Sequence, residues 1–121
     1  MSIMSPDLQR IERIRDYCNE IQNTITRYGN SLDVFRSDRD YQRSVSFSIF
    51  QIGELSTGLS PEYRQATANH VQWGPMRGMR NLVAHNYGNM DLEIIWETAI
   101  NDIPMLKRFC EEQLAGTSEM F

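Results

Sequence analysis

The sequence between Asp38 and Leu59 reads DRDYQRSVSFSIFQIGELSTGL, and its apolar residues recur at spacings of three and four positions. This spacing predicts an α-helix. One face of that helix carries Tyr41, Val45, Ile49, Ile52, Leu55 and Leu59. Phe47 and Phe50 lie off this face, so the helix is apolar on more than one side. A helix with two apolar faces packs at the centre of a domain or joins a subunit interface.

A second helix is predicted before the central one, over about residues 6–28. Its start combines a capping hydroxyl at Ser5, a proline in the first turn and an acid near the helix N-terminus. Apolar residues continue at helical spacing until Gly29, a residue typical of helix ends. A connector that contains Ser31 and Phe35 then leads to the central helix.

Three elements are predicted after the central helix. The first is a short helix or turn over about 61–71, and the second is a helix over about 75–86 that Pro75 opens. The last helix begins after Asp91 and continues toward the C-terminus. We expect it to be kinked or divided at Pro104, because proline lacks an N–H and clashes with the preceding turn.

The predicted fold class is all-α, since no segment alternates apolar and polar residues with a period of two. We expect an antiparallel up-and-down bundle of about four to five helices. The 121 residues suit one domain over 1–121, with a core of about 6–114 and a frayed tail over 115–121. The apolar runs are too short for a membrane span and the N-terminus does not resemble a signal peptide. A soluble, cytoplasmic protein is therefore expected.

The charge is unevenly distributed along the chain. The formal net charge is −4, which argues against a protein that coats nucleic acid by bulk attraction. Residues 63–90, however, carry three arginines and no acid, and they hold both histidines, His70 and His85. Lys107 is the only lysine; the other cations are arginines, which bind phosphate with two nitrogens at once, although an arginine-rich genome would produce the same bias. We expect chemistry on anions within this cationic segment, residues 63–90.

No metal site and no cofactor are predicted. The two histidines are too far apart in the sequence, and Cys18 and Cys110 too isolated, to match the usual spacings of zinc ligands. Phosphate-cradling glycine loops and a GxSxG nucleophile turn are absent from the sequence. We expect both cysteines to be small buried thiols and His70 to be solvated.

The centre of the cationic segment holds the candidate catalytic residues. Histidine exchanges a proton near neutral pH, and arginine binds phosphate and stabilises the charge that develops on it. Arg80 and His85 thus suit metal-free RNA cleavage, with a second histidine supplied by a dimer. In an ideal helix these two residues point about 140° apart. Asn81 shares a face with His85 and can orient its ring.

Spacing alone leaves a second interpretation open. In it, His85 caps the C-terminus of its helix and Arg80 forms an ordinary surface ion pair. Glu54, in the apolar central helix, is expected to pair with an arginine or a histidine, because a lone buried carboxylate is costly. The residues expected to pack in the core or at an interface are Trp73, Met76, Met79 and Trp96.

These residues resemble those of a known family, the HepT-like branch of the HEPN domains (higher eukaryote and prokaryote nucleotide-binding domains). The motif of this branch, R-x4-H-x-Y, is matched without departure by Arg80, His85 and Tyr87. The similarity extends to 38–55, which looks like the second helix of the family, and to both flanks of the motif. It covers about residues 7–114.

The resemblance implies a homodimer in which the motifs of both chains line one cleft. It further implies a metal-independent endoribonuclease that leaves 2′,3′-cyclic phosphate ends. His85 would be the general acid and base, Arg80 the phosphate clamp, and Asn81 and Tyr87 substrate-positioning residues. Glu54 is a weaker candidate for such a role, as a partner of Arg80 or His85, and a purely structural ion pair is the alternative.

Proteins of this kind are typically toxins of toxin–antitoxin systems. The resemblance implies a small nucleotidyltransferase antitoxin of the MNT type, which transfers AMP to the motif tyrosine, here Tyr87. Loading that tyrosine with anionic nucleotides would fill the cleft and repel RNA. Two alternatives remain open. One is a non-catalytic dimer that binds a nucleotide or a nucleotidyltransferase, and the other is a helical adaptor in which Arg80 and His85 only organise the dimer seam.

Overall fold

The computed structural model describes the backbone of residues 4–85 and 91–119, and the side chains of these residues except 81–85 and 117–119. Within these ranges every regular element is helical. The long elements are α1 (Pro6–Tyr28), α3 (Arg39–Gly58), α5 (Trp73–His85) and a final rod of α6 (Leu92–Glu97), the π-helical turn η1 (Thr98–Asp102) and α7 (Ile103–Glu119). Two short helices, α2 (Leu32–Ser37) and α4 (Pro61–Ala66), lie between long ones.

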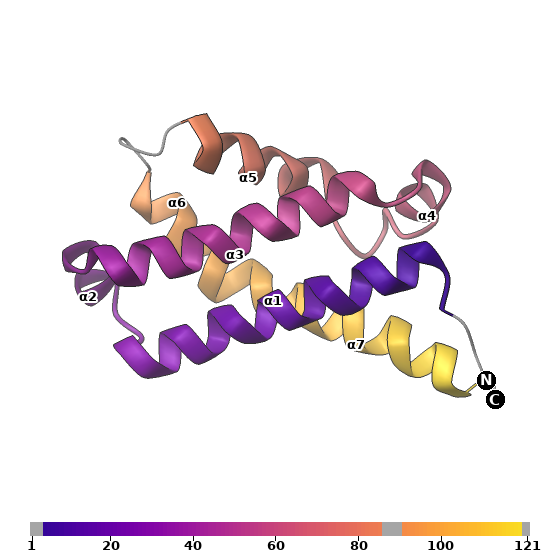
Figure 1. Ribbon diagram of the computed structural model, residues 1–121, viewed down its shortest axis with the longest axis horizontal. Coiled ribbons are helices and arrows are strands. Elements are labelled where there is room, and N and C mark those ends of the chain that lie inside the picture. The colour runs from indigo at the N-terminus through magenta and orange to yellow at the C-terminus, as the bar shows by residue number, and fades with distance from the viewer. Residues whose placement is uncertain (1–3, 86–90, 120–121) are drawn as a thin grey trace.

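The long elements form an antiparallel bundle. Helices α1, α3 and α5 lie side by side with α3 in the middle, and the rod from α6 to α7 crosses behind α3 and α1 (Figure 1). Successive long elements run in opposite directions, with α2 at one end of the bundle and α4 at the other (Figure 1). The predicted all-α, up-and-down architecture is confirmed. None of the described helices combines the length and the apolar character that crossing a membrane requires.

The predicted helix starts are confirmed by side-chain caps. The side chains of Ser5, Asp38, Ser60 and Asp91 each accept backbone N–H bonds from residues two or three positions later. Each cap satisfies donors that have no partner within the helix. These local contacts explain why the sequence alone indicates where α1, α3, α4 and α6 begin.

Two elements differ from expectation. The connector after α1 contains helix α2, which Ser31 caps and Phe35 anchors in the core. Helix α5 begins at Trp73, two residues before Pro75, because a proline in the first turn forfeits no intrahelical hydrogen bond. Helix α7 extends through Gly116 to Glu119, and the predicted fraying of 115–121 stays a prediction. One glycine costs a helix only about 1 kcal/mol, too little to end it.

The final rod accommodates Pro104 through a change of helical geometry. In η1 the N–H of Ile103 bonds to the carbonyl of Thr98, five residues earlier, and Pro104 follows directly. A wider π turn makes room for the proline ring, which would clash with the preceding turn of a regular α-helix. The predicted division near Pro104 is confirmed, and the irregular turn precedes the proline.

An aromatic cluster closes the end of the bundle that holds α2. The ring of Tyr41 stacks on Tyr28 with centroids 4.9 Å apart, and Phe35 packs edge-on against Tyr41 at 5.1 Å. Trp96 of α6 lies 5.3 Å from Phe35. The Tyr41 hydroxyl donates to the carbonyl of Gly29 at 2.9 Å. Side chains from α1, α2, α3 and α6 thus form one packed unit.

The two thiols are buried, as predicted. Cys18 of α1 and Cys110 of α7 are free and inaccessible to solvent. Desolvation raises the pKa of both thiols, that of Cys110 to about 12. Both therefore stay protonated at neutral pH and pack as small apolar groups.

The expected packing roles are also confirmed. Trp73 and Trp96 are buried in the core, and Met76 and Met79 are half-buried against it. These four side chains therefore pack α5 and α6 against the core of the bundle.

Helices α3 and α5 approach closely at Gly53. A Cβ atom placed on Gly53 would lie 2.8 Å from the Cβ and 3.2 Å from the backbone nitrogen of Arg80. Distances this short force one helix to move. The absence of a side chain at Gly53 therefore sets the spacing between these helices and, with it, the position of Arg80.

Gly53→Ala is expected to lower the free energy of unfolding by about 1–3 kcal/mol, because the added methyl collides with the backbone of α5. Gly78→Ala is the matched control, since a Cβ there meets nothing within 4 Å. It should stabilise the protein by about 0.5–1 kcal/mol through helix propensity. Urea denaturation measures both changes. Equal shifts of the same sign would contradict the close approach at Gly53.

Candidate functional site

Helix α5 carries two residues of the predicted motif, Arg80 and His85, in its C-terminal half. Arg80 lies in the described part of the helix, and His85 is the last residue of α5. The side chains of Asn81 and His85, and all of Tyr87, lie outside the described residues. Their predicted roles therefore stay predictions, and the described part of the site is built around Arg80.

Arg80 pairs with Glu54 across the contact between α5 and α3. Its Nε donates to a carboxylate oxygen of Glu54. The expectation that Glu54 pairs with a cation is confirmed, and Arg80 is that cation. Glu54 directly follows Gly53, so the ion pair forms beside the point where the two backbones approach.

The ion pair contributes mainly to geometry. The side chains of Arg80 and Glu54 are 44% and 42% exposed, so solvent screens their attraction. Pairs of this kind stabilise a protein by about 0–1 kcal/mol. Glu54 therefore orients the guanidinium at the rim of the α3–α5 contact, where an anionic ligand can reach it.

Helix α5 contacts the bundle both at its start and near Arg80. At its start, the Trp73 Nε1–H donates to the hydroxyl of Thr67 at 2.9 Å, and this bond is buried. Next to Arg80, the last described side chain of α5, the Met79 sulfur lies 4.0 Å from the hydroxyl of Thr98 in η1. Together with the contact at Gly53, these interactions fix the axis of α5 against α3 on one side and η1 on the other.

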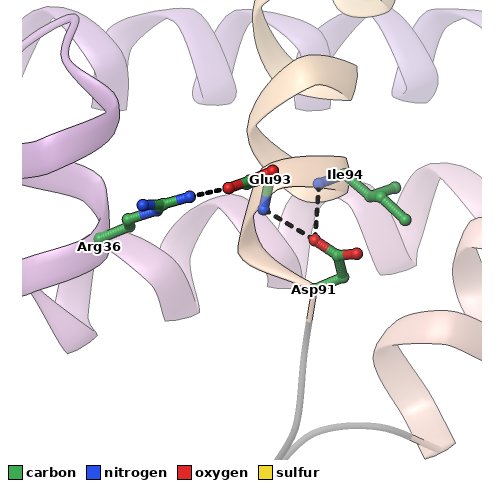
Figure 2. A network of polar contacts seen from close by, with 4 residues as sticks. All are labelled: Arg36, Asp91, Glu93 and Ile94. Atoms are coloured by element: carbon green, nitrogen blue, oxygen red, sulfur yellow. Dashed lines mark hydrogen bonds and ion pairs between the residues drawn. The ribbon is translucent and has the colours of Figure 1, made fainter.

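The start of α6 is fastened in a similar way. Asp91 caps the helix by accepting the N–H groups of Glu93 and Ile94, and Glu93 forms an ion pair with Arg36 of α2 (Figure 2). This network ties the N-terminus of α6 to α2. The described chain is thus held to the bundle on both sides of residues 86–90. Before them, Arg80 pairs with Glu54 of α3, and after them, Glu93 pairs with Arg36 of α2.

Sequence reasoning missed two structural contributors to this site. Gly53 was an isolated glycine in an apolar helix, a pattern that signals close packing of another backbone. The pairing of Arg36 with Glu93 joins residues far apart in the sequence, and no local pattern indicates it. Among the described residues, no three His, Cys, Asp or Glu side chains gather into a possible metal site.

Comparison with known proteins places this site in a family. The family described as Ribonuclease HepT-like matches residues 8–113. A candidate RNase of Caldanaerobacter subterraneus subsp. tengcongensis is 34% identical over 86 residues, which are 71% of this chain and 76% of the relative. A candidate RNase of Methanocaldococcus jannaschii is 28% identical over 91 residues, 68% of this chain and 83% of the relative.

A third relative, a candidate ribonuclease HepT of Thermococcus cleftensis, is 27% identical over 99 residues, 82% of this chain and 81% of its own length. No solved structure matches the chain significantly. The family match spans α1 to α7 and includes the Arg80 motif. The chain therefore belongs to the Ribonuclease HepT-like family, a ribonuclease-type branch of the HEPN domains.

Proposed function

We propose that this protein is a metal-independent endoribonuclease in which Arg80 and His85 act on the scissile phosphate. The observation that carries the proposal is the pairing of Arg80 with Glu54, five residues before His85, in a chain of a ribonuclease-type family. Arg80 and His85 both belong to the cationic segment 63–90, and its positive charge suits an anionic substrate.

The proposed reaction uses the ribose itself as the nucleophile. His85 takes the proton of the 2′-hydroxyl, and the 2′-oxygen attacks the adjacent phosphorus. The bond from phosphorus to the 5′-oxygen breaks, and a second His85 gives that oxygen a proton. Arg80 stabilises the negative charge that builds on the phosphate oxygens. The products are a 2′,3′-cyclic phosphate and a 5′-hydroxyl, and no water is consumed in this step.

The need for a second histidine makes the proposed enzyme a homodimer. Phe47 supports this assembly: it is 57% exposed, touches Tyr17 edge-on at 6.2 Å, and precedes Glu54 by seven residues. Seven residues are about two helical turns, so Phe47 and Glu54 share one face of α3. A second copy on this face would cover an exposed aromatic ring and bring two motifs together.

Charges around Phe47 also suit a second copy. The groove beside it, about 490 Å³ between α1 and α3, is lined by Asp16 and Glu20 as well as Arg43. Across a two-fold axis each copy presents the same patch, so Arg43 of one copy can face the acids of the other. Self-complementary charge of this kind favours pairing of identical chains.

His85→Ala is expected to lower RNA cleavage in the presence of a metal chelator by at least about 100-fold, because the proton-transfer group is lost. Arg80→Gln should cause a similar loss in kcat. Glu54→Gln should lower kcat less and leave stability nearly unchanged, because its half-exposed ion pair orients Arg80. The assay follows cleavage of labelled RNA and identifies the ends of the products.

The matched control is Arg27→Gln, which removes an exposed cation from the last turn of α1. It should cleave RNA like the wild type. Undiminished cleavage by His85→Ala, or products without a cyclic phosphate, would refute the proposed chemistry.

Phe47→Ser is expected to shift the protein from dimer to monomer and to abolish cleavage, because the aromatic anchor of the proposed seam is lost. Ile94→Ser is the control, since Ile94 of α6 is also exposed, at 43%. Sedimentation velocity measures the assembly, and the RNA assay runs beside it. A Phe47→Ser dimer with full activity would place the seam elsewhere.

We further propose that the enzyme is a toxin neutralised by a nucleotidyltransferase of the MNT type. Tyr87 lies two residues after His85, so AMP attached there would add negative charge next to the catalytic motif. In the transfer, the phenol oxygen attacks the α-phosphorus of ATP, pyrophosphate leaves, and the phenol proton passes to solvent. The modified cleft would repel RNA.

Co-expression with such a nucleotidyltransferase is expected to increase the mass of the protein by one or more AMP units and to restore growth. Tyr87→Phe should stay unmodified, because it lacks the accepting hydroxyl. Intact-mass and peptide mass spectrometry check the modification. Growth rescue of the Tyr87→Phe strain without modification would show that inhibition proceeds by occlusion instead.

A second candidate function is a non-catalytic dimer that binds a nucleotide or a nucleotidyltransferase. The net charge of −4 favours it, because general RNA nucleases often have a more positive field. The two functions separate in the cleavage assay. Unmodified, dimeric wild-type protein that binds nucleotide but leaves RNA intact would support the binding function.

A further inference from the structure

A hollow of about 370 Å³ lies at the start of α5, and neither Arg80 nor Glu54 lines it. Its walls are the connector 68–72 after α4, the first turn of α5, and the junction of η1 with α7. This volume falls within the range that binds small organic ligands. The described part of the catalytic site makes no use of it.

The floor of the hollow is apolar. Val71 and Leu106 are buried beneath it, and Met76 is half-buried beside them. Met105, on the rim, is 69% exposed, an unusual position for a large apolar side chain. Two flexible thioethers around an apolar floor make favourable contacts with the edge and face of a flat aromatic ring.

The polar side chains that line the hollow indicate which hydrogen-bonding groups a bound aromatic ring would carry. Asn69, Gln72 and Asp102 line it, and in the described structure none of these three side chains has a hydrogen bond or an ion pair. The amides offer both donors and acceptors, whereas the Asp102 carboxylate only accepts. The His70 ring, which also lines the hollow, packs near-parallel to Phe109 at 6.1 Å. A ligand with donors and acceptors along one edge fits this set.

We propose that the hollow binds a nucleobase with an amino group beside an acceptor nitrogen on its base-pairing edge, adenine or cytosine, as part of a nucleotide. Carboxylates accept the amino hydrogens of cytosine, and side-chain amides pair with the edge of adenine. Asp102 selects for the amino group, and Gln72 or Asn69 pairs with the adjacent ring nitrogen. The ring packs between Met76 and Met105.

The outer face of α5 offers a route for the phosphates. Gly74, Arg77 and Gly78 are exposed on that face, and a Cβ on either glycine would meet nothing within 4 Å. Without side chains at 74 and 78, a phosphate backbone can approach the helix closely and pair with Arg77. Met76 of the hollow and Arg80 are one helical turn apart, about 6 Å along α5. A strand that leaves the hollow along α5 can therefore reach Arg80 after one turn of the helix.

The nucleotide can be free or part of RNA, and two experiments distinguish these sources. In the first, NMR titrations measure the binding of AMP, CMP and UMP to the intact protein. The wild type should bind AMP or CMP at least about tenfold more tightly than UMP. Asp102→Asn should reduce this ratio to near one, and Met105→Ala should weaken the binding of all three nucleotides. Glu112→Gln, an exposed carboxylate of α7 outside the hollow, is the control.

In the second experiment, RNA oligomers with adenosine, cytidine or uridine at one position beside the cleavage site are cleaved by wild type and by Asp102→Asn. A preference for the amino-bearing bases that Asp102→Asn loses, with kcat on the uridine oligomer unchanged, assigns the hollow to the RNA substrate. This result rests on the proposed ribonuclease function. Mononucleotide binding without any change in cleavage assigns the hollow to a free nucleotide.

The ribonuclease function and the nucleobase site can be refuted independently of each other. His85→Ala should bind mononucleotides like the wild type, so loss of cleavage leaves the binding result intact. Equal binding of AMP, CMP and UMP by the wild type overturns the nucleobase site, even if RNA is cleaved. An unchanged ratio in Asp102→Asn overturns it as well.

Discussion

The close contact between Gly53 and the backbone of Arg80 is the constraint on which the rest of the site depends. It brings α3 and α5 together at one point, and the next residue of α3, Glu54, then meets the Arg80 side chain. A larger residue at 53 would separate the helices and the ion pair together. The position of the Arg80 side chain is therefore coupled to backbone packing, although the ion pair itself is half-exposed to solvent.

The remaining contacts hold the ends of the bundle around this point. The aromatic cluster at Tyr41 joins α1, α2, α3 and α6, and the pair of Arg36 with Glu93 adds a polar tie between α2 and α6 (Figure 2). Trp73 fixes the opposite end of α5 through Thr67. The described chain before and after residues 86–90 is thus anchored to different helices.

Most of the fold could be predicted from short-range sequence patterns such as helix caps. Caps such as Asp38 and Asp91 act within three residues, so the sequence indicates the helix starts directly. Helix α2 was missed because six residues are too few to show a period, although Ser31 marked its start. The charge of Glu54 predicted a cationic partner, the family resemblance implied Arg80 or His85, and the folded chain shows that it is Arg80. The hollow beside α5 gathers residues from distant segments, so no pattern along the sequence could indicate it.

The buried thiols make the chain convenient for spectroscopy. Cys18 and Cys110 are the only cysteines of the sequence, and neither reaches solvent. Thiolates, not thiols, react with maleimides and mild oxidants, and both native groups stay protonated at neutral pH. A cysteine introduced on the surface would therefore react alone, without removal of the native ones. Spin labels or fluorophores can then report distances in a protein that keeps both of its native cysteines.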